Sequence, residues 1–175
     1  ETKMIAERVI KSYENEIIFH SIRPATVCGF SPRMRLDVSV NMFAFQALKS
    51  KSISVFGGNQ IRPNIHIQDL INVYKHFISN PNLPSGFYNA GFENLKIIDI
   101  AKKVAKIIPA EIVVTKNEND PRSYRQNSDK LKSTGFEKKY SISDAIKEIK
   151  EKYESKKFVE SVDCYTVKKM KELKL

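Results

Sequence analysis

The apolar positions of the chain follow two different periods. Spacings of three and four residues are typical of amphipathic helices, and they recur in five stretches, at residues 2–13, 38–49, 68–79, 98–108 and 145–153. Short apolar runs of strand length stand between them, at residues 17–22, 53–56, 86–91 and 112–114, with a short extended piece at 64–67. Ser141, with Asp144 three residues later, marks the start of the last helix. The pattern predicts helices and strands that alternate along the chain.

This alternation is typical of an α/β fold with a mostly parallel sheet. The first predicted element is a helix, and in a right-handed βαβ unit such a helix follows a strand that this sequence does not contain. We therefore expect the chain to be the C-terminal half of a larger α/β protein.

Composition excludes several classes of protein. The chain has 175 residues, 41% of them hydrophobic, which is enough to bury a core. It has no apolar run of about 18 residues, so we expect no membrane-spanning segment, and its first residues do not follow a signal-peptide pattern. Cys28 and Cys164 stand 136 positions apart, without metal-ligand spacing. A soluble, cytoplasmic protein with reduced thiols is the simplest expectation.

The positive charge is spread along the whole chain. Lys and Arg number 30 against 20 Asp and Glu, a formal net charge of +10. No segment forms a basic arm, and many lysines alternate with acidic residues as on solvated helix faces, so we expect no nucleic-acid binding. Six of the seven arginines instead lie in irregular or turn-flanked segments: Arg23, Arg33, Arg35, Arg62, Arg122 and Arg125. Guanidinium groups gathered in this way suit recognition of phosphate or carboxylate.

Four motifs follow one another in a distinctive order. Lys3 is followed four residues later by Glu7; then come IRPATVCG at residues 22–29, GNQIRPNIHIQDL at 58–70 and GFYNAG at 86–91. In order and approximate spacing they resemble the extended short-chain dehydrogenases/reductases, and more narrowly the NAD-dependent nucleotide-sugar epimerases and dehydratases. The resemblance covers residues 1 to about 150 and corresponds to the C-terminal half of such a protein.

The resemblance implies that Lys3 is catalytic and also binds the cofactor. Family members carry a Tyr-x-x-x-Lys pair, in which the tyrosine is the acid and base and the lysine lowers the pKa of that tyrosine and binds the nicotinamide ribose. A free phenol has a pKa of about 10, so it needs a nearby ammonium group. Lys3 matches the lysine, and the tyrosine would stand two residues before Glu1. The glycine-rich phosphate loop would also lie upstream, so we expect this fragment alone to be inactive.

The second motif implies further cofactor contacts. By resemblance, Pro24, Ala25 and Thr26 line the cofactor, NAD (or NADP), and Thr26 also hydrogen-bonds the substrate. Many relatives carry asparagine at the position of Thr26, so that contact is open to change. From the residues alone, the segment is a buried strand end with Arg23 paired to a carboxylate.

The substrate contacts implied by resemblance come from three later segments. Asn41 matches an asparagine that binds the nucleotide diphosphate of the substrate. Arg62 and Arg122, 60 residues apart, match arginines that converge on the same diphosphate; a local pair of Arg122 with Asp120 is the alternative. Arg33 and Arg35 are loop cations, phosphate ligands, or cations that order the loop against acidic neighbours.

The histidines do not indicate a metal site. His66 is interpreted as a hydrogen-bonding residue at a strand end, and Asp69 as an anion at a helix N-terminus, where negative charge is favoured. His20 and His76 have no ligand spacing to any Cys or acidic residue, so we expect no bound metal.

The implied architecture is the C-terminal part of an NAD(P)-binding Rossmann-type parallel sheet plus a smaller α/β substrate-binding domain. The predicted boundaries assign 1–30 and 63–92 to the Rossmann domain, 31–62 and 93–150 to the substrate domain, and 151–175 to a lysine-rich helical extension.

The implied activity is transient oxidation of a sugar carbon, usually C4, in a nucleotide diphosphate sugar, by a homodimeric enzyme. Epimerase, dehydratase and 4-ketoreductase of this family are not separated by the residues present. Two other classes stay open: a non-catalytic module that binds a nucleotide diphosphate, and a basic protein whose tail binds an acidic partner.

Overall fold

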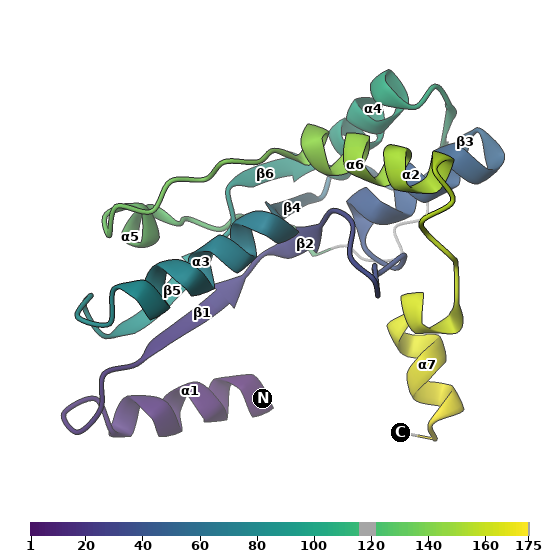
Figure 1. The fold of residues 1–175 in the computed structure, drawn as a ribbon. Helices are drawn as coiled ribbons and strands as arrows, with labels where there is room; N and C mark the ends of the chain where they lie inside the picture. The colour runs from purple at the N-terminus through teal and green to yellow at the C-terminus, as the bar shows by residue number, and fades with distance from the viewer. Residues whose placement is uncertain (116–121, 175) are drawn as a thin grey trace.

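The computed structural model describes residues 1–115 and 122–174 (Figure 1). The helices are α1 (Thr2–Ser12), α2 (Ser39–Ser50), α3 (Ile67–Ser79), α4 (Ile97–Ile107), α5 (Asp129–Lys132), α6 (Ile142–Glu154) and α7 (Thr166–Glu172), with a 3-10 helix, η1, at Val162–Cys164. The strands are β1 (His20–Pro24), β2 (Thr26–Cys28), β3 (Ser52–Phe56), β4 (Ile61–His66), β5 (Gly86–Ala90), β6 (Glu93–Lys96) and β7 (Glu111–Thr115).

The strands pair mostly in parallel, as the alternating pattern predicts. β1 pairs with β5, β2 with β4 and β3 with β7, all in parallel, whereas β6 joins β4 antiparallel. The described strands form small sheets, with the orders β1-β5, β2-β4-β6 and β3-β7. The predicted α/β class is therefore confirmed.

Two segments of the chain pass from the first sheet to the second, and they do so side by side. Only Ala25 separates β1 of the first sheet from β2 of the second, and β5 leads after two residues into β6. The Ala25 amide donates to the Ala90 carbonyl at 2.9 Å. A Cβ at position 91 would stand 2.7 Å from the Ala25 Cβ. Gly91 is therefore needed where the two backbones meet, because a side chain has no room there.

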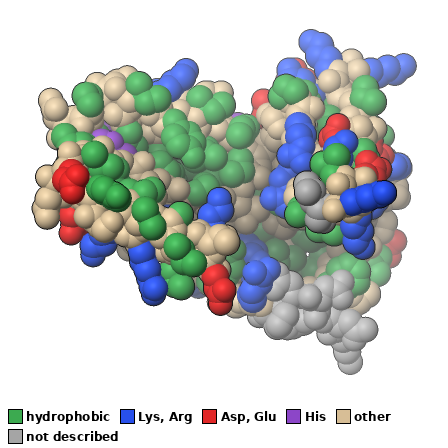
Figure 2. Space-filling view, turned by 90° about the horizontal axis from the view of Figure 1, so that it is seen from below, with side chains coloured by type: hydrophobic (Ala, Val, Ile, Leu, Met, Phe, Trp, Pro, Cys, Tyr) green, Lys and Arg blue, Asp and Glu red, His purple; other side chains and the backbone are tan. Residues whose placement is uncertain are grey.

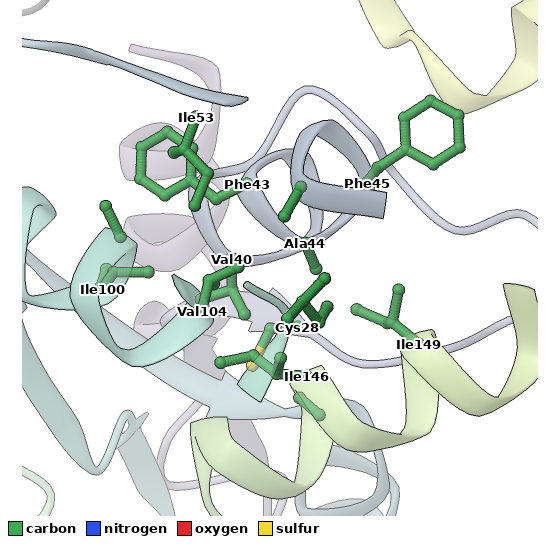
Figure 3. Packing of buried hydrophobic residues seen from close by; sticks show 14 of the residues in the cluster. Cys28, Val40, Phe43, Ala44, Phe45, Ile53, Ile100, Val104, Ile146 and Ile149 are labelled. Atoms are coloured by element: carbon green, nitrogen blue, oxygen red, sulfur yellow. The ribbon is translucent and has the colours of Figure 1, made fainter. Parts of the chain in front are cut away.

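Buried apolar side chains gather in two clusters. The larger cluster packs α2, α4 and α6 against β3, and Figure 3 shows its side chains from these elements pointing toward one another, among them Val40, Phe43, Ile53, Ile100 and Ile146. The smaller cluster includes Ile65, Val73, Phe77, Tyr88, Leu131 and Phe136. Leu131 and Phe136, assigned by the predicted boundaries to the substrate domain, thus pack with side chains of the predicted Rossmann segment 63–92. The domain boundaries themselves stay a prediction.

The two cysteines pack in the larger cluster. Cys28 is 1% and Cys164 2% exposed. Burial raises the pKa of the Cys28 thiol to about 12, so this thiol stays protonated at neutral pH and is a poor nucleophile. Both side chains serve packing.

The strand predicted at 17–22 is found slightly further along the chain, as β1. Pairing with β5 begins at His20, opposite Gly86, and Ile18 is 66% exposed. The apolar run therefore does not mark the buried part of the strand. β6 is a strand that the pattern does not predict, because Glu93–Lys96 contains a single apolar residue.

α1 lies apart from the helices that form the larger cluster (Figure 1). None of its residues is buried, and Met4, Ile5 and Val9 are 50%, 54% and 54% exposed. An ion pair links it to the sheet: the Arg23 Nε and Nη2 atoms donate to the two Glu7 carboxylate oxygens at 2.7 and 2.5 Å. Hydrogen bonds from Arg23 hold the pKa of Glu7 below its usual value. α1 is thus attached to β1 beside Pro24.

The predicted helix start at Ser141 is confirmed as a capping box. The Ser141 hydroxyl accepts from the Asp144 amide at 3.3 Å, and the Asp144 carboxylate accepts from the Ser141 amide at 2.9 Å. Replacing Ser141 with Ala is expected to lower the free energy of unfolding by about 1 kcal/mol, because an amide in the first turn of α6 loses its acceptor. Urea denaturation followed by circular dichroism measures this. Ser155→Ala, at the other end of α6, is the control; an equal loss in both variants would contradict the assignment.

Candidate functional site

A cavity of about 540 Å³ brings together residues from segments far apart in the sequence. It is lined by Thr26, Arg35, Asp37, Val38, Ser39, Met42, Phe43, Ser54, Phe56, Gln60, Arg62, Ile97, Arg122 and Tyr124. The start of β2, the segment before α2, α2 itself, β3 and the start of β4 supply most of its walls. Three of the predicted substrate-binding residues, Thr26, Arg62 and Arg122, therefore meet in one place.

Hydrogen bonds to the start of β4 explain why Arg62 and Arg122 meet. The Arg62 Nη1 atom donates to the Ile61 carbonyl at 3.0 Å and also to the Arg122 carbonyl. The Ile61 amide donates to the Ser123 hydroxyl at 3.0 Å, and the Tyr124 amide donates to the Ile61 carbonyl at 3.3 Å. Segment 122–124 is thus held against the first residues of β4.

Tyr124 adds an aromatic face to the cavity. The guanidinium carbon of Arg62 lies 5.4 Å from the centre of the Tyr124 ring, within the range of a cation–π contact. Arg62 is therefore oriented by two carbonyls and a ring. Asp120, the alternative partner of Arg122, lies outside the described residues.

The predicted cofactor-binding residues of the second motif line an adjoining cavity. Its volume is about 440 Å³, and its walls are Pro24, Ala25, Thr26, Pro63, Asn89, Tyr124, Arg125 and Gln126. Thr26 and Tyr124 belong to both cavities. The change of sheet at Ala25 explains this position, because it places Thr26 at the beginning of β2, where the two cavities adjoin.

Asn41 lines neither of these two cavities. Its side chain is 2% exposed, accepts from the Gly29 amide and donates to the Arg35 carbonyl, both at 3.0 Å. It lines a smaller cavity of about 240 Å³ together with Arg33 and with Arg35, which also lines the cavity of Arg62 and Arg122. Its observed bonds hold the segment between β2 and α2, and its predicted contact with a diphosphate stays a prediction.

Lys3 is exposed on α1 and lines neither of the two adjoining cavities. Its predicted catalytic and cofactor-binding role stays a prediction. Glu7, one turn further along α1, pairs with Arg23, directly before Pro24. α1 is thereby tied to the segment that leads into the cavity walls.

Arg35 and Asp37 are cavity residues that the sequence pattern leaves undecided or misses. The Arg35 Nε atom donates to Asp37 Oδ1 at 2.8 Å, and the Thr166 amide donates to Asp37 Oδ2 at 3.0 Å. Partial burial raises the pKa of Asp37, but the hydrogen bonds from Arg35 and Thr166 outweigh it and hold the pKa below its ordinary value. Asp37 is therefore charged at neutral pH. Its spacing of two residues from Arg35 is the signal that could have indicated the pair.

His66 and Asp69 have the structural roles expected from the sequence. The Gln68 amide donates to His66 Nδ1 at 3.1 Å, so His66 caps the N-terminus of α3. Asp69 is fully buried and accepts from the Lys139 and Tyr140 amides, both at 3.0 Å. Within the described ranges, no group of three or more His, Cys, Asp or Glu side chains is placed to hold a metal ion.

Seen from below, the surface is hollowed between two parts of the molecule (Figure 2). Lys and Arg side chains gather on the right-hand side of this hollow in Figure 2. Among the residues that the structure describes, no helix has the length and apolar character needed to cross a membrane.

Solved structures with the same fold include two UDP-sugar 4-epimerases and a protein complexed with NADPH. The chain superposes on UDP-N-acetylglucosamine 4-epimerase from Bacillus cereus with a TM-score of 0.73 at 18% identity, covering 93% of this chain and 55% of that one. For the UDP-glucuronic acid 4-epimerase of Bacillus cereus, in complex with UDP-glucuronic acid and NAD, the TM-score is 0.72 at 24% identity, with 90% and 52% covered. For RMD from Pseudomonas aeruginosa, complexed with NADPH, it is 0.72 at 20% identity, with 88% and 55% covered.

These comparisons agree with the resemblance carried by the motifs. The chain spans about half the length of the solved structures that it matches. The sequence model described as "NAD dependent epimerase/dehydratase family" matches residues 1–91, which is more than half of the chain and includes all four motifs in full. On this match, the chain belongs to the NAD-dependent epimerase/dehydratase family.

Proposed function

We propose that this chain is part of an NAD(P)-dependent epimerase or dehydratase that acts on a nucleotide diphosphate sugar. The observation that carries the proposal is the cavity in which Arg35, Arg62 and Arg122 come together with Thr26. Three guanidinium groups at one cavity supply positive charge and paired N–H donors for two phosphates.

The roles proposed for the cavity residues follow from their chemistry. Arg62 and Arg122 hold the diphosphate from the β4 side, and the Thr26 hydroxyl donates to or accepts from the sugar. The Arg62 side chain is already oriented by two carbonyls and Tyr124, so little conformational freedom is lost when an anion binds. The solved complex of a family fold with UDP-glucuronic acid and NAD supports this ligand class.

The residues at the adjoining cavity fit a nicotinamide cofactor. Pro24 and Ala25 present apolar side chains, which suit the face of a flat ring, and Thr26 adds a hydroxyl where this cavity adjoins the arginine-lined one. When bound, the cofactor would supply a reversible acceptor for a hydride from a sugar carbon, which we propose to be C4. Pro24, Ala25 and Thr26 would hold the ring beside the sugar.

Lys3 is proposed to act through a tyrosine one helical turn upstream of it. Its ammonium group would lower the pKa of that phenol and bring it closer to neutrality, where proton exchange with a sugar hydroxyl is efficient. We further propose a homodimer, because the apolar side chains of Met4, Ile5 and Val9 on α1 are half exposed and such faces favour contact with another helix. We also propose a cytoplasmic location, which the free thiols of Cys28 and Cys164 support.

Calorimetric titration with UDP, GDP, CDP and dTDP tests the proposed diphosphate site. We expect Arg62→Ala and Arg122→Ala each to weaken the best-bound nucleotide by about 30-fold, or about 2 kcal/mol. Arg122→Ala is the cleaner change, since it keeps the carbonyl to which Arg62 donates. Arg62→Lys is expected to fall between the wild type and Arg62→Ala, because lysine keeps the charge but not the fork.

Arg8→Ala is the matched control. Arg8 is a cation on α1 that lines neither of the adjoining cavities, so its loss is expected to leave nucleotide affinity unchanged. Unchanged affinity in both Arg62→Ala and Arg122→Ala would rule out the proposed site.

A further inference from the structure

The segment that joins α6 to α7 packs against the region before and within α2. We call residues 158–166 the C-terminal strap. The Phe158 ring lies edge-on to the rings of Phe30 and Phe45, with centres 6.4 and 5.9 Å apart. Glu160 accepts from Lys49 of α2 at 2.7 Å. The strap is thus anchored by apolar and charged contacts to the larger core.

The strap also binds the segment between β2 and α2, through its backbone and through one of its side chains. The Leu36 amide donates to the Cys164 carbonyl at 2.8 Å. The Thr166 amide donates to Asp37 Oδ2 at 3.0 Å, while Asp37 Oδ1 accepts from Arg35 Nε at 2.8 Å. Asp37 therefore connects the strap to the guanidinium of Arg35.

The segment between β2 and α2 is held from two sides. On the inner side, the Asn41 side chain donates to the Arg35 carbonyl at 3.0 Å. On the outer side are the bonds from Cys164 and Thr166. Arg35 and Asp37 line the same cavity as Arg62 and Arg122, so the strap acts on a wall of that cavity. Figure 1 shows α7 next to the loop that precedes α2.

We propose that the C-terminal strap positions Arg35 as a third guanidinium for the substrate diphosphate, with Asp37 as the positioning residue between them. This inference rests on the proposed function, because it concerns the same cavity and ligand class. The Arg35 and Asp37 side chains are 50% and 25% exposed, and a pair of such exposed charges holds its geometry weakly by itself. The Thr166 amide fixes the second carboxylate oxygen and so reduces the freedom of the pair.

Thr166 offers a substitution that removes the amide and little else. It is the first residue of α7, the helix position at which proline is best tolerated. The preceding residue, Tyr165, is extended, with φ −123° and ψ 97°, a conformation that suits a residue before proline. Thr166→Pro therefore deletes the N–H donor to Asp37, and Thr166→Ala is the matched control that keeps it.

The test measures UDP affinity by calorimetry in the full chain. We expect Thr166→Pro to weaken UDP about 5-fold, since one hydrogen bond to a charged group is lost, and Arg35→Ala to weaken it about 10-fold. Thr166→Ala should stay within about 2-fold of the wild type, because the amide remains. In the Arg35→Ala background, Thr166→Pro should have no further effect if the strap acts through Arg35. Hydrogen exchange should show faster exchange of the Leu36 amide in Thr166→Pro than in Thr166→Ala.

The outcomes separate this inference from the proposed function. If Arg62→Ala weakens UDP but Thr166→Pro binds it like Thr166→Ala, the inference is wrong and the proposed function stands. An equal loss from Thr166→Pro with and without Arg35 also overturns it. If the wild type binds none of the four nucleotides, the proposed function fails and the inference fails with it. Should Thr166→Pro be unfolded in a thermal melt, Asp37→Ala replaces it, and the same loss, again absent without Arg35, is expected.

Discussion

Replacing Phe43 with Ala is expected to lower the free energy of unfolding by about 3–5 kcal/mol. Phe43 lies in the larger cluster (Figure 3) and is 2% exposed. The surrounding side chains come from α2, α4, α6 and β3, so they cannot all close the space that the ring leaves, and the cost of the cavity adds to the lost burial. Chemical denaturation of the wild type and the variant, followed by circular dichroism, measures the difference.

Two variants make this result specific. Phe43→Leu keeps most of the apolar volume and should cost about 1 kcal/mol. Ile78→Ala, on a side chain that is 78% exposed, should change the stability by at most about 0.5 kcal/mol. If Phe43→Ala costs no more than Ile78→Ala, Phe43 is not part of the core. Because Phe43 also lines the cavity with Arg62, Phe43→Leu would show whether the cavity tolerates a changed wall.

Replacing Asp69 with Ala is expected to lower the free energy of unfolding by about 3 kcal/mol, because two backbone amides each lose a charged acceptor whose own side chain is fully buried. These amides belong to Lys139 and Tyr140, each 3.0 Å from a carboxylate oxygen of Asp69, immediately before the capping box of α6. Asp69→Asn keeps one acceptor oxygen and should lose less. The measurement is again the free energy of unfolding in urea.

Asp99→Ala is the matched control for Asp69. Asp99 is the third residue of α4, as Asp69 is of α3, so both removals lose the favourable interaction of an anion with a helix N-terminus, about 0.3–1 kcal/mol. The difference between the two variants isolates the bonds to Lys139 and Tyr140. Equal losses would mean that these bonds contribute nothing to stability.

Periodicity was enough to predict α1, α2, α3, α4 and most of α6, but neither α5 nor all of the strands. α1, α2, α3 and α4 lie within one or two residues of the predicted stretches, since each repeats apolar side chains every three or four positions. β6 has no such pattern, because it is defined by its pairing with β4, from Ile61 opposite Lys96 to Asn64 opposite Glu93. A strand that owes its form to a distant partner leaves little trace in its own sequence.

The same limit applies to the candidate site. The family resemblance predicts that Arg62 and Arg122 bind the same diphosphate. That the two residues lie close together depends on hydrogen bonds between Ile61, Ser123 and Tyr124, which no local sequence pattern encodes. The sequence leaves the role of Arg35 undecided, because its partner Asp37 is held by Thr166, 129 positions further along the chain. Local spacing indicates which side chains have the chemistry to bind phosphate, and tertiary contacts decide which of them lie close together.

At Ala25 and Gly91 the backbone passes from one sheet to the next. β1 and β5 are paired neighbours before this point, whereas their continuations β2 and β6 are separated by β4, which pairs with both. Asn64 of β4 stands opposite Thr26 of β2 and opposite Glu93 of β6. Arg62 stands two residues before Asn64 and therefore lies on the same face of the strand. A slip by one residue would turn Arg62 to the other face. The backbone position from which this guanidinium extends is therefore set by the pairing of β4 with β2 on one side and with β6 on the other.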